Sequence, residues 1–270
     1  MKKTNPIGVF DSGVGGLSVL RELLKVFPEE NFKYIGDTLR MPYGVRSPED
    51  VKNSTFECLS FLAEEGGAKG AVIACNTATC YGLENAQEKL DIPVVGVVEP
   101  ACSYASLVTK NNKVALIATE GTVKSKVYDE TIKKFNKDIV LKGVGAPQLV
   151  LDVENGNLEN DIVEKTINGY LEQLGDFNYD TLILGCTHFP LARKAFERIF
   201  EKQNRDVKLV DPANRTAIAL KEILEKDDLL NQEKNPKIDF FSTNDIEKFK
   251  ATVKNVIDTE NEETFKEVTL

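Results

Sequence analysis

Short apolar runs alternate with amphipathic segments along the whole chain. The runs have the length and composition of buried strands, whereas the longer segments repeat their apolar positions with helical spacing. We expect strands at 7–10, 32–36, 71–75, 94–98, 114–118, 139–144, 181–186, 207–210 and 238–242. Helical patterns include 17–27, 48–65, 78–90, 123–135, 158–174, 191–202 and 215–225. This alternation predicts an α/β fold with mostly parallel sheets flanked by helices.

Two of the apolar runs end in a cysteine. Cys186 is followed by Thr187 and by His188, the only histidine in the chain, and Cys75 is followed by Asn76 in a similar setting. Ligands of parallel α/β sheets bind beyond the carboxyl ends of the strands, and helix N-termini lower the pKa of a thiol. We therefore interpret both cysteines as reactive groups rather than as buried structural thiols.

Each cysteine has a candidate partner for its proton. His188 lies two residues after Cys186, and Asp11 directly follows the first predicted strand, where it should face the same cleft as Cys75. The glycine-rich segment that begins with Asp11 and Ser12 has neither the G-x-G-x-x-G pattern nor the lysine of a P-loop. Nucleotide binding is therefore a weak interpretation of this turn.

Composition excludes several classes of protein. The formal net charge is −9, and no cluster of Lys and Arg is interleaved with aromatic residues, so nucleic-acid binding is not expected. No apolar run is long enough to cross a membrane, and the N-terminus has no room for a signal region, so we expect a cytoplasmic protein. Five widely spaced cysteines and a single histidine argue against a disulfide framework and against a zinc site. The structural thiols would be Cys58, Cys80 and Cys102.

Five ordered motifs together resemble the glutamate racemase family, from about residue 7 to the C-terminal end. They are Asp11-Ser12-Gly13-Val14-Gly15-Gly16-Leu17, Gly36-Asp37-Thr38, Pro42-Tyr43-Gly44, Ala74-Cys75-Asn76-Thr77-Ala78 and Leu184-Gly185-Cys186-Thr187-His188. Thr187-His188 resembles glutamate rather than aspartate racemases. The resemblance implies a cofactor-independent isomerase that interconverts L- and D-glutamate and supplies D-glutamate for peptidoglycan, and hence for cell-wall biogenesis and cell shape.

The resemblance also implies roles for individual residues. Cys75 would deprotonate D-glutamate and Cys186 L-glutamate, with Asp11 and His188 tuning their respective thiols. Glutamate would be bound by Asp11, Ser12, Pro42, Tyr43, Gly44, Asn76, Thr77, Thr119, Thr122, Thr187 and His188. No metal or cofactor is expected, and Glu154 has no assigned role.

We expect two similar α/β domains, with the active site at their interface. The first would comprise residues 1–97 together with 208–270 and carry Cys75, and the second would comprise 98–207 and carry Cys186. We expect the protein to form a homodimer and to bind a small-molecule substrate. We expect it to bind neither nucleic acid nor a membrane.

Three other functions remain open. A racemase of aspartate or of another amino acid would differ only in its pocket. A cysteine hydrolase could use Cys186 with His188, but a separation of two residues at a strand-to-helix turn predicts poor geometry and leaves Cys75 without a role. A binding protein without catalytic activity is the third possibility.

Overall fold

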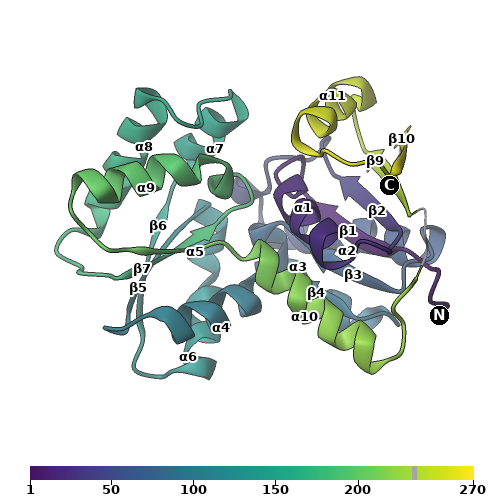
Figure 1. Ribbon diagram of the computed structural model, residues 1–270, viewed down its shortest axis with the longest axis horizontal. Coiled ribbons are helices and arrows are strands. Elements are labelled where there is room, and N and C mark those ends of the chain that lie inside the picture. Colours follow the sequence, from purple (N-terminus) through teal and green to yellow (C-terminus); the bar gives the residue numbers. More distant parts are fainter. Residues whose placement is uncertain (233–235) are drawn as a thin grey trace. The chain divides into compact units, whose positions relative to one another are not determined.

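A computed structural model describes residues 1–232 and 236–270 of the chain (Figure 1). The chain forms two compact units, of which the first comprises Met1–Val97 with Ala213–Leu270 and the second comprises Val98–Pro212. Residues 233–235 fall within the range expected for the first domain and lie outside the described residues.

The first unit contains a six-stranded parallel sheet in the order β10-β9-β2-β1-β3-β4. Its strands are β1 (Ile7–Asp11), β2 (Phe32–Gly36), β3 (Gly70–Ile73), β4 (Val94–Gly96), β9 (Lys237–Ser242) and β10 (Glu262–Glu267). The central strands β1 and β3 are buried along their whole length, as expected for a parallel sheet covered on both faces.

Helices cover both faces of this sheet (Figure 1). Ile7 and Val9 of β1 pack with the helices of one face, and the alternate residue Phe10 packs with those of the other. The first face carries α1 (Leu17–Val26), α10 (Ala213–Lys226) and α11 (Ile246–Val256). The second carries α2 (Pro48–Ser60), which continues as a π-helical turn at Phe61–Glu65, and α3 (Asn76–Lys89).

The second unit contains a four-stranded parallel sheet in the order β6-β5-β7-β8. Its strands are β5 (Lys113–Ala118), β6 (Val140–Gly145), β7 (Thr181–Gly185) and β8 (Lys208–Val210). Its helices are α4 (Val98–Val108), α5 (Glu120–Ser125), α6 (Val127–Phe135), α7 (Pro147–Glu154), α8 (Asp161–Leu171) and α9 (Arg193–Lys202). Short 3₁₀ turns lie at Tyr43–Val45 in the first unit and at Glu172–Leu174 and Phe189–Ala192 in the second.

The expected α/β class is confirmed, with differences in detail. The second unit extends to Pro212 rather than to residue 207, because β8 pairs with β7 and so belongs to the second sheet. The helix expected over 123–135 is divided at Lys126, whose φ of 63° is left-handed. The structure also contains α4, α7, α11 and β10, which were not among the elements expected from the sequence.

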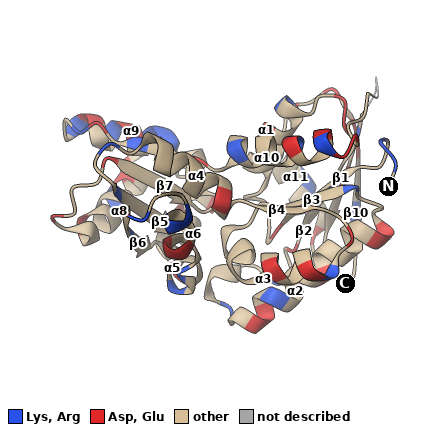
Figure 2. Ribbon diagram, turned by 90° about the horizontal axis from the view of Figure 1, so that it is seen from below, with Lys and Arg blue, Asp and Glu red and all other residues tan. Residues whose placement is uncertain are grey.

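Charged residues lie mainly on the helices (Figure 2). Strands β3, β4 and β7 carry none, whereas α2 and α9 each carry both signs. In the described ranges, no helix is long and apolar enough to cross a membrane.

One ion pair of the first unit is buried completely. The side chain of Lys69 has no exposed surface and that of Glu30 is 2% exposed, and the Lys69 ammonium donates to Glu30 Oε2 and to the Lys3 carbonyl, both at 2.5 Å. The Asn231 N–H donates to the second oxygen of Glu30 at 2.7 Å. This pair therefore ties the N-terminal segment to the chain that follows α10.

Removal of one member of this pair should be costly. We expect Lys69→Met to lower the free energy of unfolding by about 3–5 kcal/mol, because Glu30 then remains buried without its counter-charge. The exposed pair of Lys221 and Glu225, 3.8 Å apart, provides the control, and Lys221→Met should cost less than about 1 kcal/mol. Urea unfolding measures both values, and equal costs would contradict the role assigned to Lys69.

Candidate active site

Cys75 lies at the carboxyl edge of the first sheet. Strand β3 ends at Ile73, and Cys75 is the N-cap residue of α3, so its thiol lies at the positive end of the helix dipole. The Ser12 hydroxyl donates to Cys75 Sγ at 3.4 Å. Phe10 pairs with Ile73 in the sheet, which brings the turn after β1 next to the turn after β3. The side chains of Ser12 and Cys75 therefore meet although they are 63 residues apart.

Asp11 is fully buried beside this thiol. Its Oδ2 accepts from the Gly13 N–H at 3.0 Å, and a side chain at Gly16 would place Cβ only 2.5 Å from the Asp11 Cβ, so this turn requires glycine. The Tyr34 hydroxyl donates to the Gly13 carbonyl at 2.9 Å. Burial, together with the negative charges of Asp11 and Cys75, raises the pKa of Tyr34 well above its ordinary value. The Tyr34 phenol therefore stays protonated and able to donate.

The loop after β2 turns the phenol of Tyr43 into the core. The Tyr43 hydroxyl donates to Asp37 Oδ2 at 2.5 Å, while Gly44 is half-buried and Pro42 is exposed. Because the polar end of Tyr43 is engaged by Asp37, the backbone around Tyr43 and Gly44 is the part of this loop that can donate to a ligand. The other residues expected on this side, Asn76 and Thr77, are buried in the first turn of α3.

Cys186 occupies the corresponding position in the second unit. Strand β7 ends at Gly185, and Cys186 follows it directly. Cys186 Sγ lies 3.6 Å from His188 Nδ1, and His188 Nε2 lies 3.2 Å from Glu154 Oε1 at the end of α7. The imidazole thus bridges a thiol and a carboxylate, and Thr187 is buried beside them.

The surroundings of His188 favour its charged form. Burial opposes protonation, but the contact with Cys186 and the ion pair with Glu154 outweigh it and raise the pKa of His188 to about 10. At neutral pH the ring is therefore an imidazolium, which places a positive charge 3.6 Å from Cys186 Sγ. Glu154, 27% exposed, supplies part of this effect, and sequence reasoning left it without a role.

The geometry corrects one expectation from the sequence. A separation of two residues was expected to give poor contact between Cys186 and His188, yet the two side chains are in contact. The strand has ended at Gly185, and His188 adopts a right-handed helical conformation, so the chain turns and returns the imidazole to the thiol. Geometry alone therefore does not exclude a cysteine hydrolase.

The sheet register places Thr119 and Thr122 at the same sheet edge as Cys186. Ala118, the last residue of β5, pairs with Gly185 of β7, so Thr119 and Cys186 follow neighbouring strand ends. Thr119 is the N-cap of α5, and its hydroxyl donates to Thr122 Oγ1 at 3.0 Å. The sheet thus brings these two threonines to the edge that carries Cys186.

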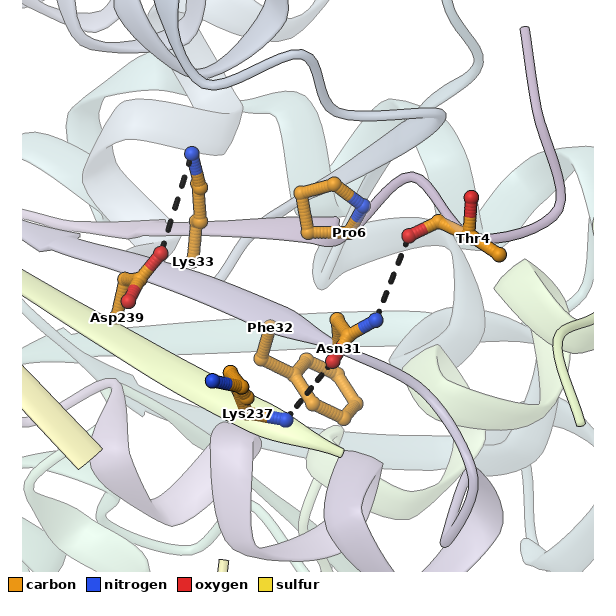
Figure 3. A pocket seen from close by; sticks show the side chains of 7 residues that line it. All are labelled: Thr4, Pro6, Asn31, Phe32, Lys33, Lys237 and Asp239. Atoms are coloured by element: carbon orange, nitrogen blue, oxygen red, sulfur yellow. Dashed lines mark hydrogen bonds and ion pairs between the residues drawn. The ribbon is translucent and has the colours of Figure 1, made fainter. Parts of the chain in front are cut away.

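A shallow hollow of about 340 Å³ lies at the opposite edge of the first sheet (Figure 3). It surrounds Phe32 and Lys237, the first residues of β2 and β9, and is therefore remote from the strand ends that carry the candidate residues. The polar groups drawn there pair with one another, as Lys33 and Asp239 do at 3.9 Å. Among the residues described, no group of three or more His, Cys, Asp or Glu side chains could hold a metal ion, and no cysteine forms a disulfide.

Each of the two α/β units has, just beyond the carboxyl end of an inner strand of its parallel sheet, a cysteine that contacts a polar side chain, and small-molecule enzymes with parallel α/β sheets carry their sites at this edge. The chain belongs to the Asp/Glu/Hydantoin racemase family, which it matches over residues 7–220. It is 44% identical over 224 residues to a glutamate racemase of Geobacter metallireducens, covering 83% of this chain and 82% of the relative. The resemblance to this family and the assignment to the isomerases are thereby confirmed.

Solved structures agree over nearly the whole length. A glutamate racemase isoform from Bacillus anthracis superposes with a TM-score of 0.92 at 36% identity, covering 99% of this chain and 98% of that one. The glutamate racemase of Francisella tularensis in complex with D-glutamate superposes with a TM-score of 0.90 at 33% identity, with the same coverage.

The single histidine permits a direct test of the site. We expect the imidazole NMR signals of the protein, prepared without a histidine tag, to titrate with the pKa of His188 at about 10 instead of the ordinary value of about 6.5. Glu154→Gln should lower this pKa, because one of the two groups that stabilise the imidazolium is then neutral. A pKa near 6.5 in the unmodified protein would contradict the assignment.

The same shift has a consequence for stability. The folded protein binds the His188 proton more tightly than the unfolded chain does, so this contribution is complete below about pH 6.5. It is lost as the pH rises through the folded pKa of about 10. Unfolding free energies of the parent and of Glu154→Gln should therefore converge over this range.

Proposed function

We propose that the protein interconverts L- and D-glutamate by proton transfer between Cα and two thiols, Cys75 and Cys186, without a cofactor. The observation that carries the proposal is the matched placement of the two cysteines, each at a strand's carboxyl end and each in contact with a polar side chain. The similarity to glutamate racemases over most of the chain supports glutamate as the substrate.

Racemisation explains the need for two thiols. A proton must leave Cα on one face and another must arrive on the opposite face, and a single base could do both only by crossing the substrate. In the proposed reaction a thiolate takes the Cα proton and leaves a carbanion, which the other thiol then protonates from the opposite side. Each turnover exchanges the protonation states of the two cysteines. The mechanism requires both thiols to reach one bound substrate.

The partner groups give each thiol its role. Cys75 would act on D-glutamate, with Asp11 as the acid–base partner on its side. Cys186 would act on L-glutamate, with the His188 imidazolium stabilising the thiolate and Glu154 keeping the imidazole charged.

The Cα–H bond of an amino acid is very weakly acidic, so the negative charge that develops on the carbanion and its carboxylate must be stabilised. Donors held in place before the reaction provide this without having to reorganise. We assign this task to Ser12, Asn76, Thr77, Thr187 and the backbone of the Pro42–Tyr43–Gly44 loop. We assign the ammonium or the side-chain end of the substrate to Thr119 and Thr122.

The product suggests the cellular role. D-glutamate would be supplied to peptidoglycan synthesis in the cytoplasm, and the protein would act as a homodimer. A different amino acid, aspartate foremost, is the main alternative substrate. A panel of L-amino acids followed by circular dichroism, with reductant and without added cofactor, distinguishes them, and loss of optical signal from L-glutamate alone is the expected result.

The contact between Cys186 and His188 favours a second candidate, a cysteine hydrolase. That function leaves Cys75 without a task and would produce an acyl-enzyme. Mass spectrometry of protein quenched during incubation with glutamate esters or amides would detect an acyl group on Cys186, and we expect none.

We expect Cys75→Ser and Cys186→Ser each to lower the rate of racemisation at least about a thousandfold, because an alcohol is a far weaker acid than a thiol. Cys80→Ser, on the same helix as Cys75, is the matched control and should remain active. In deuterated water the parent should incorporate solvent deuterium at Cα. Full activity of either active-site variant, or racemisation that retains the original proton, would refute the two-thiol mechanism.

A one-sided role for His188 should appear in kcat. The equilibrium constant between enantiomers is unity, so kcat/KM is necessarily equal in the two directions, and asymmetry can appear only as paired changes of kcat and KM. We expect His188→Asn to lower kcat from L- to D-glutamate more than kcat in the reverse direction, because Cys186 loses its counter-charge. Equal losses of kcat in both directions would remove the one-sided role.

A further inference from the structure

The carboxylate of Asp37 is the centre of a buried hydrogen-bond cluster in the first unit. It is fully buried, and its Oδ2 accepts from the Tyr43 hydroxyl at 2.5 Å and from Arg40 Nε at 2.6 Å. Its Oδ1 accepts from the Thr243 hydroxyl at 2.9 Å. Because a buried carboxylate is costly unless its oxygens are hydrogen-bonded, each of these donors contributes to keeping Asp37 in place.

Thr243 reaches this cluster from a distant part of the sequence. It follows the last residue of β9 and lies beyond residue 220, where the match to the racemase family ends. Its hydroxyl has two partners, since it donates to Asp37 and accepts from the Leu39 N–H at 3.0 Å. The Thr243 N–H also donates to the Gly36 carbonyl at 3.2 Å. One threonine thus contacts the end of β2 and two residues of the loop that follows it.

A second set of contacts joins the same two segments. Thr38 Oγ1 lies 2.7 Å from Ser242 Oγ and donates to the Asn244 carbonyl at 2.8 Å. On the far side of the loop, Arg40 pairs with Glu57 of α2. The start of the loop is therefore fastened to the end of β9 on one side and to α2 on the other.

These contacts determine where the Pro42–Tyr43–Gly44 backbone lies. Tyr43 is held through its hydroxyl by Asp37, and Asp37 is held in turn by Thr243. We propose that Thr243 is a positioning residue for this reaction, which orients the Pro42–Tyr43–Gly44 backbone toward the substrate carboxylate through Asp37 and Tyr43. This inference rests on the proposed function, which assigns that backbone to the carboxylate.

Substitution of Thr243 by valine tests the proposal, because valine keeps the shape and removes only the hydroxyl. Thr243→Val leaves Asp37 Oδ1 and the Leu39 N–H without this partner, and we expect kcat/KM for glutamate to fall at least tenfold. The carboxylate is common to both enantiomers, so kcat should fall by the same factor in both directions. This distinguishes Thr243→Val from His188→Asn, for which the two factors should differ.

Two variants serve as controls. Thr243→Ser retains the hydroxyl and should restore kcat/KM to within about twofold of the parent. Thr252→Val removes a threonine hydroxyl on α11 whose one hydrogen bond, within residues 1–232 and 236–270, goes to the Lys248 carbonyl of the same helix at 3.1 Å, and it should leave the kinetics unchanged. All variants are assayed well below their own melting temperatures. If Thr243 only stabilises the fold, Thr243→Val lowers the melting temperature and leaves kcat/KM unchanged.

The results distinguish a failure of the proposed racemase function from a failure of the positioning role of Thr243. If the unmodified protein does not racemise glutamate, the proposed function fails. If it is active and Thr243→Val keeps kcat/KM within twofold, or Thr243→Ser fails to restore it, the positioning role is wrong. Should Thr243→Val not fold, Thr38→Val takes its place, since the hydroxyl that it removes bonds, in the part of the chain that the structure describes, to Ser242 and Asn244. For that variant we expect a loss of at least threefold, and unchanged kinetics would overturn the proposal.

Discussion

The parallel register of the strands is the constraint on which the surroundings of both cysteines, Cys75 and Cys186, depend. Parallel strands all end at one edge of a sheet, so residues that follow paired strand ends become neighbours irrespective of their separation along the chain. The pairing of Phe10 with Ile73 brings Ser12 to Cys75, and the pairing of Ala118 with Gly185 brings Thr119 near Cys186. Hydrophobic packing of the helices on each sheet maintains this register. The positions of the candidate site residues therefore depend on the packing of the core.

The surroundings of Cys75 and Cys186 look alike in sequence and differ in electrostatics. Cys186 has an imidazolium at 3.6 Å, and that ring is held in turn by a carboxylate. Cys75 has the neutral hydroxyl of Ser12, with the buried Asp11 close by. A cation and a hydroxyl stabilise a thiolate to different extents. The two cysteines therefore occupy equivalent positions in their sheets, but different neighbouring groups act on their thiols.

Periodicity predicted the fold class and most elements, because buried parallel strands are continuous apolar runs. It did not include β10, a polar edge strand with the sequence Glu-Glu-Thr-Phe-Lys-Glu. The strand-end cysteines and His188 were also found from sequence, since their signals are local. Glu154 and Thr243 were not, because their partners lie 34 and 206 residues away and only the tertiary structure brings them together.

The first unit is made from the two ends of the chain, with the second unit inserted between them. During synthesis, residues 1–97 leave the ribosome first, yet the edge of β2 has no partner until β9 has been translated. The second unit, continuous in sequence, can close its sheet earlier. A growing chain therefore carries an unpaired strand edge from the synthesis of β2 until that of β9, and such an edge is a hydrogen-bonding surface that can recruit other nascent chains.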